Sequence, residues 1–316
     1  MKILNTLLWF CLLIPVVLGL PAVGVQAGET PVLRFAYQDR IGSVLPLIAV
    51  HNGLFAEEGV RIKPLRFSNG PACAEALYTG AADIGAMGDT AAIIMTVRSP
   101  NFVIIGSHAT GEHRHRIMIR KNAALRTLVD LKGKRIGVKK GTSTHGGLLA
   151  ALDKAGISPE AVTLVDLPPS TMVDALQAGS IDAFAASEPT PTVAEQRGAR
   201  QLLTLGGLGN DYPILLLADR KVTQRDPSLM RGFIRALRKA QQFAQEHPEE
   251  TAALVAKETG LPLEATRRAM QRHTFRLCLD QPVVESLQQT ARFLVGQHLI
   301  DHGPDWAVVL DRDYVE

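Results

Sequence analysis

The stretches 65–90, LRFSNGPACAEALYTGAADIGAMGDT, and 164–190, LVDLPPSTMVDALQAGSIDAFAASEPT, follow one plan. Each reads as a strand, a polar turn, a helix that stops at a glycine, a short strand and a second polar loop. The pattern Gly-x-x-Asp occupies 80–83 in the first stretch and 179–182 in the second, at the same offset from an Ala-Leu pair. A glycine cap before a strand is common by itself. Two such units, each with a polar turn after its first strand, favour a duplicated α/β architecture.

The loops that end the two units are candidate ligand contacts. GDT at 88–90 and SEP at 187–189 lie just past the carboxyl ends of the predicted short strands. Ligands of open α/β sheets bind in the crevice outside those ends. The duplication therefore predicts that both loops contribute to one site.

Residues 1–27 read as a cleaved secretory signal peptide. Lys2 precedes a long apolar run, and small residues occupy positions 25 and 27, as expected before a cleavage site. A transmembrane anchor is the alternative, because the run is long enough to span a bilayer, although Pro15 and Pro21 interrupt it. Cleavage implies a soluble, periplasmic protein and lowers the net charge from +3 to +2. So small a charge argues against a nucleic-acid partner.

The remaining sequence alternates strands with helices and then becomes all-helical. We predict strands at 32–38 and 60–67, with a helix at 43–59 between them, and Pro64 indicates either a sheet edge or a bulge in the second strand. The predicted helices of the C-terminal part are 226–246, 248–258, 262–273, 282–298 and 303–310. In the first of these, one apolar stripe is predicted to face the core.

The most economical topology has two lobes. Residues 28–112 and 212–316 would form lobe one, and 113–211 would form lobe two. The chain would then cross between the lobes twice, near 111–116 and 208–213.

The sequence KKGTSTHGGLLAALDKAG, at 139–156, puts three hydroxyl side chains and a histidine where a helix begins. A helix cap needs only one of them. Gly141 allows a ligand to approach the backbone, and a helix N-terminus favours an anion. The hydroxyls at 142–144 can donate hydrogen bonds without adding charge, and His145 would attract an anion if protonated. The alternative is a capped helix whose surplus hydroxyls face solvent.

Two acids, Asp89 and Glu188, lie in the polar loops. Capping of the following helix is the common use of an Asp in such a place. Glu188 could cap a helix or form hydrogen bonds between the lobes. If both acids faced the cleft, the ligand would need a donor or an amine as well as an acidic end.

Histidines gather at 108–115, and His113 and His115 would share one face of a strand. A metal site with His108 is one interpretation. A crossing strand in which Arg114 and Arg116 attract anions is the other, and we favour it, because no Cys or acid accompanies the histidines at a zinc spacing. Separately, the sequence leaves open whether the two cysteines of the mature chain, Cys73 and Cys278, pair or remain small buried residues.

Four segments resemble one protein family: PLIAVHNGLFAEEGV, ALYTGAADIGAMGDTAA, DLKGKRIGVKKGTSTHGGLLAALDKAGI and ALQAGSIDAFAASEP. Their order and spacing resemble those of periplasmic substrate-binding proteins of ABC importers, of the nitrate/sulfonate/taurine class. The resemblance implies an α/β, bilobal type II periplasmic binding protein fold, whose lobes close over one small ligand. It also implies an ABC permease in the inner membrane as partner, and we expect a monomer with no cofactor, no metal and no catalytic residues.

The resemblance places ligand contacts in the polar loops of this sequence. These residues are Gln38, Arg40, Ser43, Ser68, Asn69, Gly88, Asp89, Thr90, Gly141, Thr142, Ser143, Thr144, His145, Ser187 and Glu188. Ser187 stands where many members of the family carry an aromatic residue, often Trp. The ligands of those members are therefore not carried over directly.

We expect the ligand to be a small organic solute with an oxyanion, sulfonate-like and either anionic or zwitterionic. A pyrimidine-like heterocycle stacked on Tyr37 and Tyr212 is the alternative ligand. A small exported enzyme is the alternative function. It is disfavoured because the sequence contains no Gly-x-Ser-x-Gly, His-Glu-x-x-His or phosphate-loop motif, and Ser143 and His145 are too close in sequence to form a nucleophile–base pair.

Overall fold

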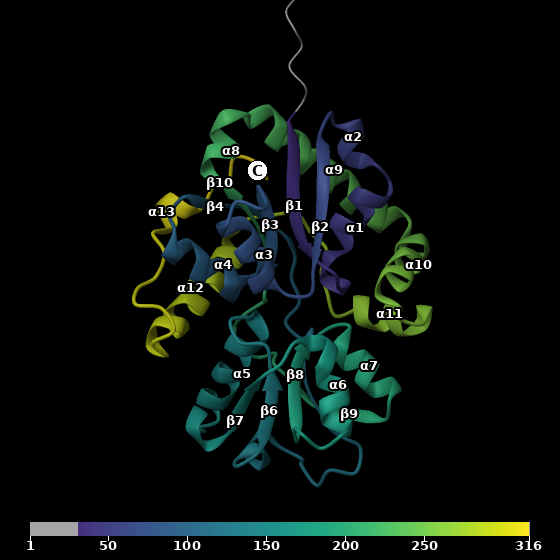
Figure 1. The fold of residues 1–316 in the computed structure, drawn as a ribbon, viewed down its shortest axis with the longest axis vertical. Helices are drawn as coiled ribbons and strands as arrows, with labels where there is room; N and C mark the ends of the chain where they lie inside the picture. The colour runs from purple at the N-terminus through teal and green to yellow at the C-terminus, as the bar shows by residue number, and fades with distance from the viewer. Residues whose placement is uncertain (1–30, 316) are drawn as a thin grey trace, which may run out of the picture. The chain divides into compact units, whose positions relative to one another are not determined.

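The computed structural model describes residues 31–315, so the predicted signal peptide at 1–27 lies outside the described residues. Within 31–315 the chain forms two five-stranded sheets, each covered by helices (Figure 1). No helix in this range is long and apolar enough to cross a bilayer.

The first sheet has the strand order β2-β1-β3-β10-β4. Its strands are β1 (Val32–Gln38), β2 (Arg61–Phe67), β3 (Ile84–Gly88), β4 (Phe102–Ala109) and β10 (Ile214–Asp219). β1 runs parallel to β2 and β3, whereas β10 runs antiparallel to β3 and β4. β2 is an edge strand in which Pro64 pairs opposite Phe35. The predicted edge is confirmed, since a proline has no N–H to offer a second neighbour.

The second sheet has the order β7-β6-β8-β5-β9 and repeats this pattern. Its strands are β5 (His115–Arg120), β6 (Arg135–Val138), β7 (Thr163–Asp166), β8 (Ala183–Ser187) and β9 (Ala199–Thr204). β6 runs parallel to β7 and β8, and β5 runs antiparallel to β8 and β9. The strands of each sheet fall within one of the two predicted lobes, whose boundaries stay a prediction.

Helices connect the strands and cover both sheets. Those between strands are α1 (Val44–His51), α2 (Leu54–Glu57), α3 (Gly70–Tyr78), α4 (Asp89–Arg98), α5 (Ser143–Lys154), α6 (Pro169–Gln177) and α7 (Thr190–Gln196). The C-terminal ones are α8 (Arg220–Arg225), α9 (Pro227–Glu246), α10 (Pro248–Thr259), α11 (Leu263–Met270), α12 (Gln281–Gly296) and α13 (Trp306–Val309).

Three helix predictions need correction. The single helix expected at 43–59 is broken into α1 and α2, because Gly53 takes a left-handed conformation with φ of 69°. Two of the predicted C-terminal ranges, 262–273 and 303–310, shorten to α11 and α13. The apolar stripe of α9 is confirmed: Phe233 is fully buried and packs edge-on against Phe35, with ring centroids 5.0 Å apart.

An arginine–aspartate clamp holds the first repeated unit together. The Arg34 side chain donates from Nη2 to Asp83 Oδ1 at 2.7 Å and from Nε to Oδ2 at 3.0 Å, and the Arg34 backbone N–H donates to Oδ2 at 2.8 Å. Its Nη1 also donates to the carbonyl of Gly80. The clamp ties the start of β1 to the turn before β3.

The second unit carries the same clamp. Arg135 donates from its backbone N–H and Nε to Asp182 Oδ2 at 2.9 and 3.2 Å, and from Nη2 to the carbonyl of Gly179 at 2.7 Å. The Gly-x-x-Asp match in the sequence therefore marks one structural device used twice, which supports the predicted duplication.

We expect Asp83→Ala to lower the melting temperature by about 3–8 °C, because hydrogen bonds to a charged group each contribute about 1.5–3 kcal/mol. Burial alone would raise the pKa of Asp83, but the bonds from Arg34 outweigh burial and hold that pKa below its usual value. The stabilisation is therefore present above about pH 4 and is lost as the pH falls through the folded-state pKa. Thermal unfolding at pH 7 and pH 3 tests both statements. The control is Asp174→Ala, which removes an exposed pair with Arg197 and should change the melting temperature by no more than about 2 °C.

Candidate functional site

A small cavity lies between the carboxyl ends of strands from both sheets. Its volume, counted as the space open to the centres of water molecules, is about 30 Å³. That space is enough for a compact head group but not for a larger molecule. Eight of the predicted site residues line it: Gln38, Arg40, Asn69, Gly88, Thr142, Ser143, Thr144 and Ser187. The structure thus brings together loops that follow β1, β2, β3, β6 and β8.

The other seven predicted residues do not line the cavity. They are Ser43, Ser68, Asp89, Thr90, Gly141, His145 and Glu188. The two acids have other partners, described below, and His145 Nδ1 accepts from the Gly141 backbone N–H at 3.4 Å. A binding role for the fifteen predicted residues remains a prediction.

The three hydroxyls at the start of α5 differ in whether they have a partner. Thr142 caps the helix: its Oγ1 accepts from the His145 backbone N–H at 3.3 Å and donates to the Lys139 carbonyl at 2.7 Å. Thr144 Oγ1 lies 2.6 Å from Nδ1 of His115. Ser143 Oγ is buried and has no partner among the described residues. Of the three side chains, Ser143 is therefore the one free to bind a ligand.

Ser143 also lies close to the opposite side of the cavity. A Cβ atom built on Gly88, which ends β3, would lie 2.1 Å from Ser143 Oγ. Only a glycine at position 88 lets the β3 loop and the start of α5 come this close without a shift.

Two arginines point their guanidinium groups at the cavity. Arg40 donates from Nη1 to Ser187 Oγ at 2.6 Å, which links the two sheets' loops, and Arg114 donates from Nη2 to the Tyr212 carbonyl at 2.7 Å. Burial lowers the pKa of each arginine to about 10, so both remain positively charged at neutral pH. The Nε atoms of both are buried without a partner among the described residues.

His115 is the fourth residue of the cavity wall with an unpartnered buried polar atom. Its Nε2 is buried without a partner among residues 31–315, while Nδ1 contacts Thr144. Burial, and then the charge of Arg114, lowers the pKa of His115 well below its usual value, so the imidazole is neutral at neutral pH. Tyr212 packs edge-on against this ring at 4.5 Å.

Arg114 and His115 were absent from the predicted contacts, although the sequence had pointed to both for other reasons. They lie in the crossing segment that enters β5, and no repeat or helix start marks them. Apolar residues such as Met172 and Ala185 also line the cavity, and no pattern in the sequence marked them as site residues.

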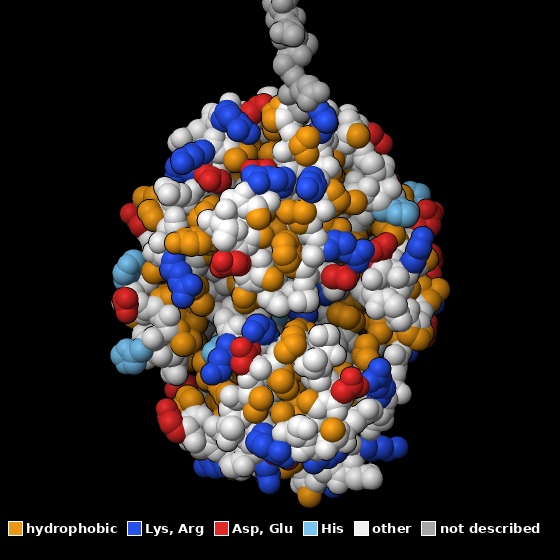
Figure 2. All heavy atoms as spheres, viewed as in Figure 1, with side chains coloured by type: hydrophobic (Ala, Val, Ile, Leu, Met, Phe, Trp, Pro, Cys, Tyr) orange, Lys and Arg blue, Asp and Glu red, His pale blue; other side chains and the backbone are white. Residues whose placement is uncertain are grey.

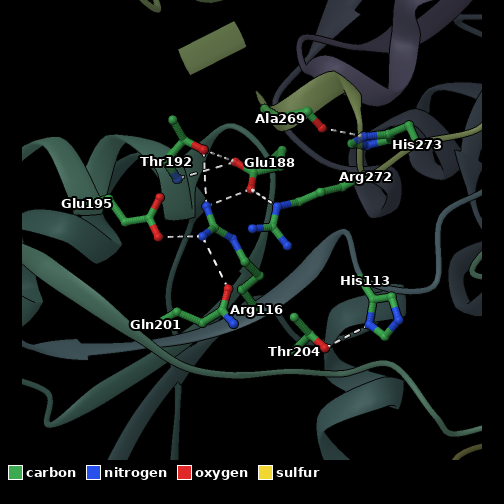
Figure 3. A network of polar contacts seen from close by, with 10 residues as sticks. All are labelled: His113, Arg116, Glu188, Thr192, Glu195, Gln201, Thr204, Ala269, Arg272 and His273. Carbon is green, nitrogen blue, oxygen red and sulfur yellow. Dashed lines mark hydrogen bonds and ion pairs between the residues drawn. The ribbon is translucent and has the colours of Figure 1, made fainter. Parts of the chain in front are cut away.

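The two acids of the polar loops turn away from the cavity. Asp89 accepts from the Thr90 backbone N–H at 2.6 Å and from Asn210 Nδ2 at 2.8 Å. Glu188 is fully buried, with Oε1 2.7 Å from Nη2 of Arg116, and its Oε2 accepts from Thr192 Oγ1 at 2.7 Å (Figure 3). Among the residues that the structure describes, no carboxylate lines the cavity, so the argument from these acids to an amine-bearing ligand fails.

Arg116 belongs to this buried network and does not line the cavity. Besides Glu188 it contacts Glu195 Oε1 at 2.7 Å and Gln201 Oε1 at 3.3 Å (Figure 3). Arg272, in the segment that follows α11, approaches Glu188 Oε1 to 3.9 Å. The expected role of Arg116 in attracting anions is therefore replaced by a structural one.

The histidine group does not assemble as a metal site. β5 begins at His115, so His113 lies in the preceding turn, where its Nδ1 contacts Thr204 Oγ1, and the two do not share a strand face. Between residues 31 and 315 no three His, Cys, Asp or Glu side chains gather closely enough to hold a metal ion. Cys73 and Cys278 are both buried and unpaired.

Neither tyrosine proposed for stacking reaches the cavity. Tyr212 is fully buried and donates from its hydroxyl to the Leu205 carbonyl at 2.6 Å. Tyr37 is buried and stacks on Phe35 with ring centroids 5.4 Å apart. The alternative ligand, a pyrimidine-like heterocycle, therefore has neither of the two tyrosines proposed to stack on it.

A family model described as NMT1-like matches residues 26–259. The chain belongs to the NMT1-like family. The alkanesulfonate-binding protein SsuA from Xanthomonas axonopodis pv. citri, solved bound to MOPS, is 27% identical to this NMT1-like chain, with a TM-score of 0.83 over 90% of this chain and 100% of its own. The taurine-binding periplasmic protein of Escherichia coli (strain K12) is 26% identical over 79% of this chain and 82% of its own.

These relatives confirm the resemblance noted in the sequence and the type II periplasmic binding protein fold. The NMT1-like chain is thus a substrate-binding protein of the ABC-importer type. The fold alone is shared more widely: the desulfurization enzyme DSZB has a TM-score of 0.73 at 17% identity, over 90% of this chain and 97% of its own.

Proposed function

We propose that this protein captures a small organic monoanion with a sulfonate-like head group in the cavity between its two sheets. It would act in the periplasm and deliver the solute to an ABC permease in the inner membrane. The observation that carries the proposal is a cavity lined by unpartnered buried groups of Arg40, Arg114, His115 and Ser143 and by no carboxylate.

These groups suit an oxyanion in chemistry as well as charge. Both arginine Nε–H groups and the Ser143 hydroxyl are donors. We assign the proton of the neutral His115 ring to Nε2, with Nδ1 accepting from Thr144, so that the imidazole also donates into the cavity. The oxygens of one head group would then satisfy buried donors that otherwise cost free energy.

The charge around the cavity favours an anion. Among the described residues, Arg40, Arg114 and Lys139 line the cavity, and Asp166 pairs with Lys139 at 3.0 Å, which gives a net charge of +2. An anionic head group would offset positive charge that the carboxylates of the protein leave uncompensated.

Closure follows from contacts to both sides of the cavity. Arg40 and Gly88 belong to the first sheet's loops, and Ser143 and Ser187 to the second's. A ligand that contacts the loops of both sheets binds the closed arrangement more tightly than an open one. The difference in binding free energy shifts the population toward the closed arrangement.

A thermal-shift and calorimetric screen tests the function. At a hundred times its dissociation constant a ligand adds about 2.7 kcal/mol, which we expect to appear as a shift of several degrees for ethanesulfonate. Taurine should bind more weakly, because among residues 31–315 no carboxylate lines the cavity to meet its ammonium. Uracil, which carries no negative charge, should not bind. Larger shifts with uracil or taurine than with ethanesulfonate would contradict the proposed ligand, and turnover of any bound compound would indicate the enzyme alternative.

Binding should be nearly independent of pH between 6 and 9. Burial lowers the pKa of His115 well below its usual value, and burial, with the charge of Lys140, also lowers the pKa of His145, so both shifts favour the neutral ring. The arginines, with pKa values of about 10, lose charge only above the range, where affinity should fall. Calorimetric titrations at pH 6, 7.5 and 9 measure this directly; a tenfold gain in affinity at pH 6 would mean that a histidine charge contributes.

A further inference from the structure

The Thr144 hydroxyl and the His115 ring form an isolated polar pair in the wall of the cavity. Thr144 Oγ1 lies 2.6 Å from Nδ1 of His115, and within residues 31–315 the Thr144 side chain makes no other hydrogen bond. Both side chains are buried, and both line the cavity. The second ring nitrogen, Nε2, is buried without a partner among the described residues. A bound ligand is therefore the partner that Nε2 can gain.

Two positions of one ring proton are compatible with this contact. If the proton is on Nε2, the Thr144 hydroxyl donates to Nδ1, and the ring is a donor toward the ligand. If the proton is on Nδ1, the ring donates to Thr144 Oγ1, and Nε2 is an acceptor toward the ligand. The two tautomers thus present opposite hydrogen-bonding groups to the same head group.

The place of Thr144 in its helix favours the first tautomer. Thr144 is the second residue of α5, where the neighbouring backbone N–H groups are donors without intrahelical partners. The nearby Lys139 carbonyl already accepts from Thr142 Oγ1. In the second tautomer the Thr144 hydroxyl proton would have no acceptor among the described residues, and Nε2 would also lack a partner. The first tautomer leaves only the Nε2–H unpartnered, so it costs less free energy.

Charge does not separate two head groups that carry the same charge. Figure 2 shows Lys and Arg side chains at the boundary between the two halves of the fold in Figure 1, and Arg40, Arg114 and Lys139 line the cavity. These cations attract a sulfonate and a phosphonate monoanion alike, since each has one negative charge. The phosphonate monoanion differs because it keeps one O–H, which needs an acceptor.

Hydrogen bonding can make the distinction that charge does not. The Ser143 hydroxyl and the Gln38 amide can each donate or accept, so they adapt to either head group. The His115 ring presents one fixed group as long as Thr144 holds its proton on Nε2. A head group that keeps a proton then meets a donor where it needs an acceptor, and one of the two is left unsatisfied in a buried site.

We propose that Thr144 is a positioning residue that fixes the His115 ring as a hydrogen-bond donor, and that the pair selects head groups without a proton over head groups that keep one. The selection rests on the proposed function, because it requires the head group to lie in this cavity. The position of the ring proton does not depend on the identity of the ligand. It can therefore be measured separately.

Heteronuclear NMR of the histidine ring nitrogens tests the positioning role in the unliganded protein. We expect the His115 proton on Nε2 in the unaltered protein and in Thr144→Ser, which keeps the hydroxyl. Thr144→Val keeps the shape but removes the hydroxyl, so the ring should populate both tautomers. His115→Gln identifies the signals by their loss. A proton on Nδ1 in the unaltered protein, or a single Nε2–H tautomer in Thr144→Val, would overturn the proposal.

Calorimetry at pH 6 with ethanesulfonate and ethylphosphonate tests the selection. The unaltered protein and Thr144→Ser should bind ethanesulfonate at least tenfold more tightly than ethylphosphonate, the scale of one unsatisfied buried hydrogen-bonding group. In Thr144→Val the ratio should fall below threefold, because the ring can then accept from the phosphonate O–H. The matched control is Thr96→Val, which removes a buried hydroxyl that donates to the Ile93 carbonyl outside the cavity. This variant should keep the full ratio.

The outcomes separate this proposal from the proposed function. If ethanesulfonate binds the unaltered protein but the ratio survives in Thr144→Val or is lost in Thr144→Ser, the role of Thr144 is overturned and the head-group function stands. If ethanesulfonate does not bind the unaltered protein, the function and the selection both fail, and the NMR measurement still decides the positioning role. Melting temperatures of the unliganded variants show whether Thr144→Val folds; if it does not, the unaltered protein and Thr144→Ser decide the position of the ring proton.

Discussion

Arg40→Gln should raise the dissociation constant for ethanesulfonate at least 100-fold, which corresponds to about 2.7 kcal/mol. The change removes one of the three positive charges that line the cavity, those of Arg40, Arg114 and Lys139, and also the hydrogen bond to Ser187 that joins its two sides. Loss of one partner of a buried, hydrogen-bonded charge pair costs about 2–5 kcal/mol in binding. The expected effect lies within that range.

The control for Arg40 is Arg66→Gln. Arg66 is also near the interface of the two sides, but it pairs with Asp39 and Glu258 and lies outside the cavity. We expect the affinity of the Arg66→Gln protein for ethanesulfonate to change less than threefold. The unliganded melting temperatures of both variants should be close to that of the unaltered protein. An Arg40→Gln protein that retained affinity within tenfold would remove this guanidinium from the binding site.

Glu188→Ala should destabilise the protein by about 3–5 kcal/mol, a fall in melting temperature of about 6–15 °C. Glu188 and Arg116 are almost fully buried and contact each other at 2.7 Å. Without the carboxylate, the Arg116 charge would be left in the interior with only Glu195 as an anionic partner. Thermal or denaturant unfolding of the unliganded protein measures the loss.

Two further variants identify the cause of that loss. Glu195→Ala removes the other carboxylate of Arg116, but its side chain is 43% exposed, so we expect less than about 1 kcal/mol. The double variant Arg116→Met, Glu188→Gln removes the buried charges together and should recover at least half of the stability lost in Glu188→Ala. No recovery in the double variant would show that packing, and not an unpaired charge, explains the effect.

Features set by local sequence were predictable. The Gly-x-x-Asp repeat led to two equivalent sheets because a helix cap and the following strand are encoded within a few residues of each other. Pro64 marked an edge strand for a similarly local reason. The residues at 142–144 were found because a helix start with surplus hydroxyls is visible in a short stretch.

Features that depend on distant partners were not predictable. The direction of Asp89 is set by Asn210, and that of Glu188 by Arg116, both far away in the chain. The Thr144 hydroxyl contacts the His115 ring and orients it. The spacing of these residues in the sequence does not reveal that contact. The sequence could therefore locate the loops of the site but not say which of their side chains face the ligand.

The two clamps lie at the opposite ends of their strands from the loops that line the cavity. Arg34 is near the start of β1 and Asp83 just precedes β3, whereas Gln38 and Gly88 end those strands. Substitutions at the loop ends can alter which solute is taken up while the clamps continue to stabilise each half. Such a protein can evolve a new cargo without first losing its fold.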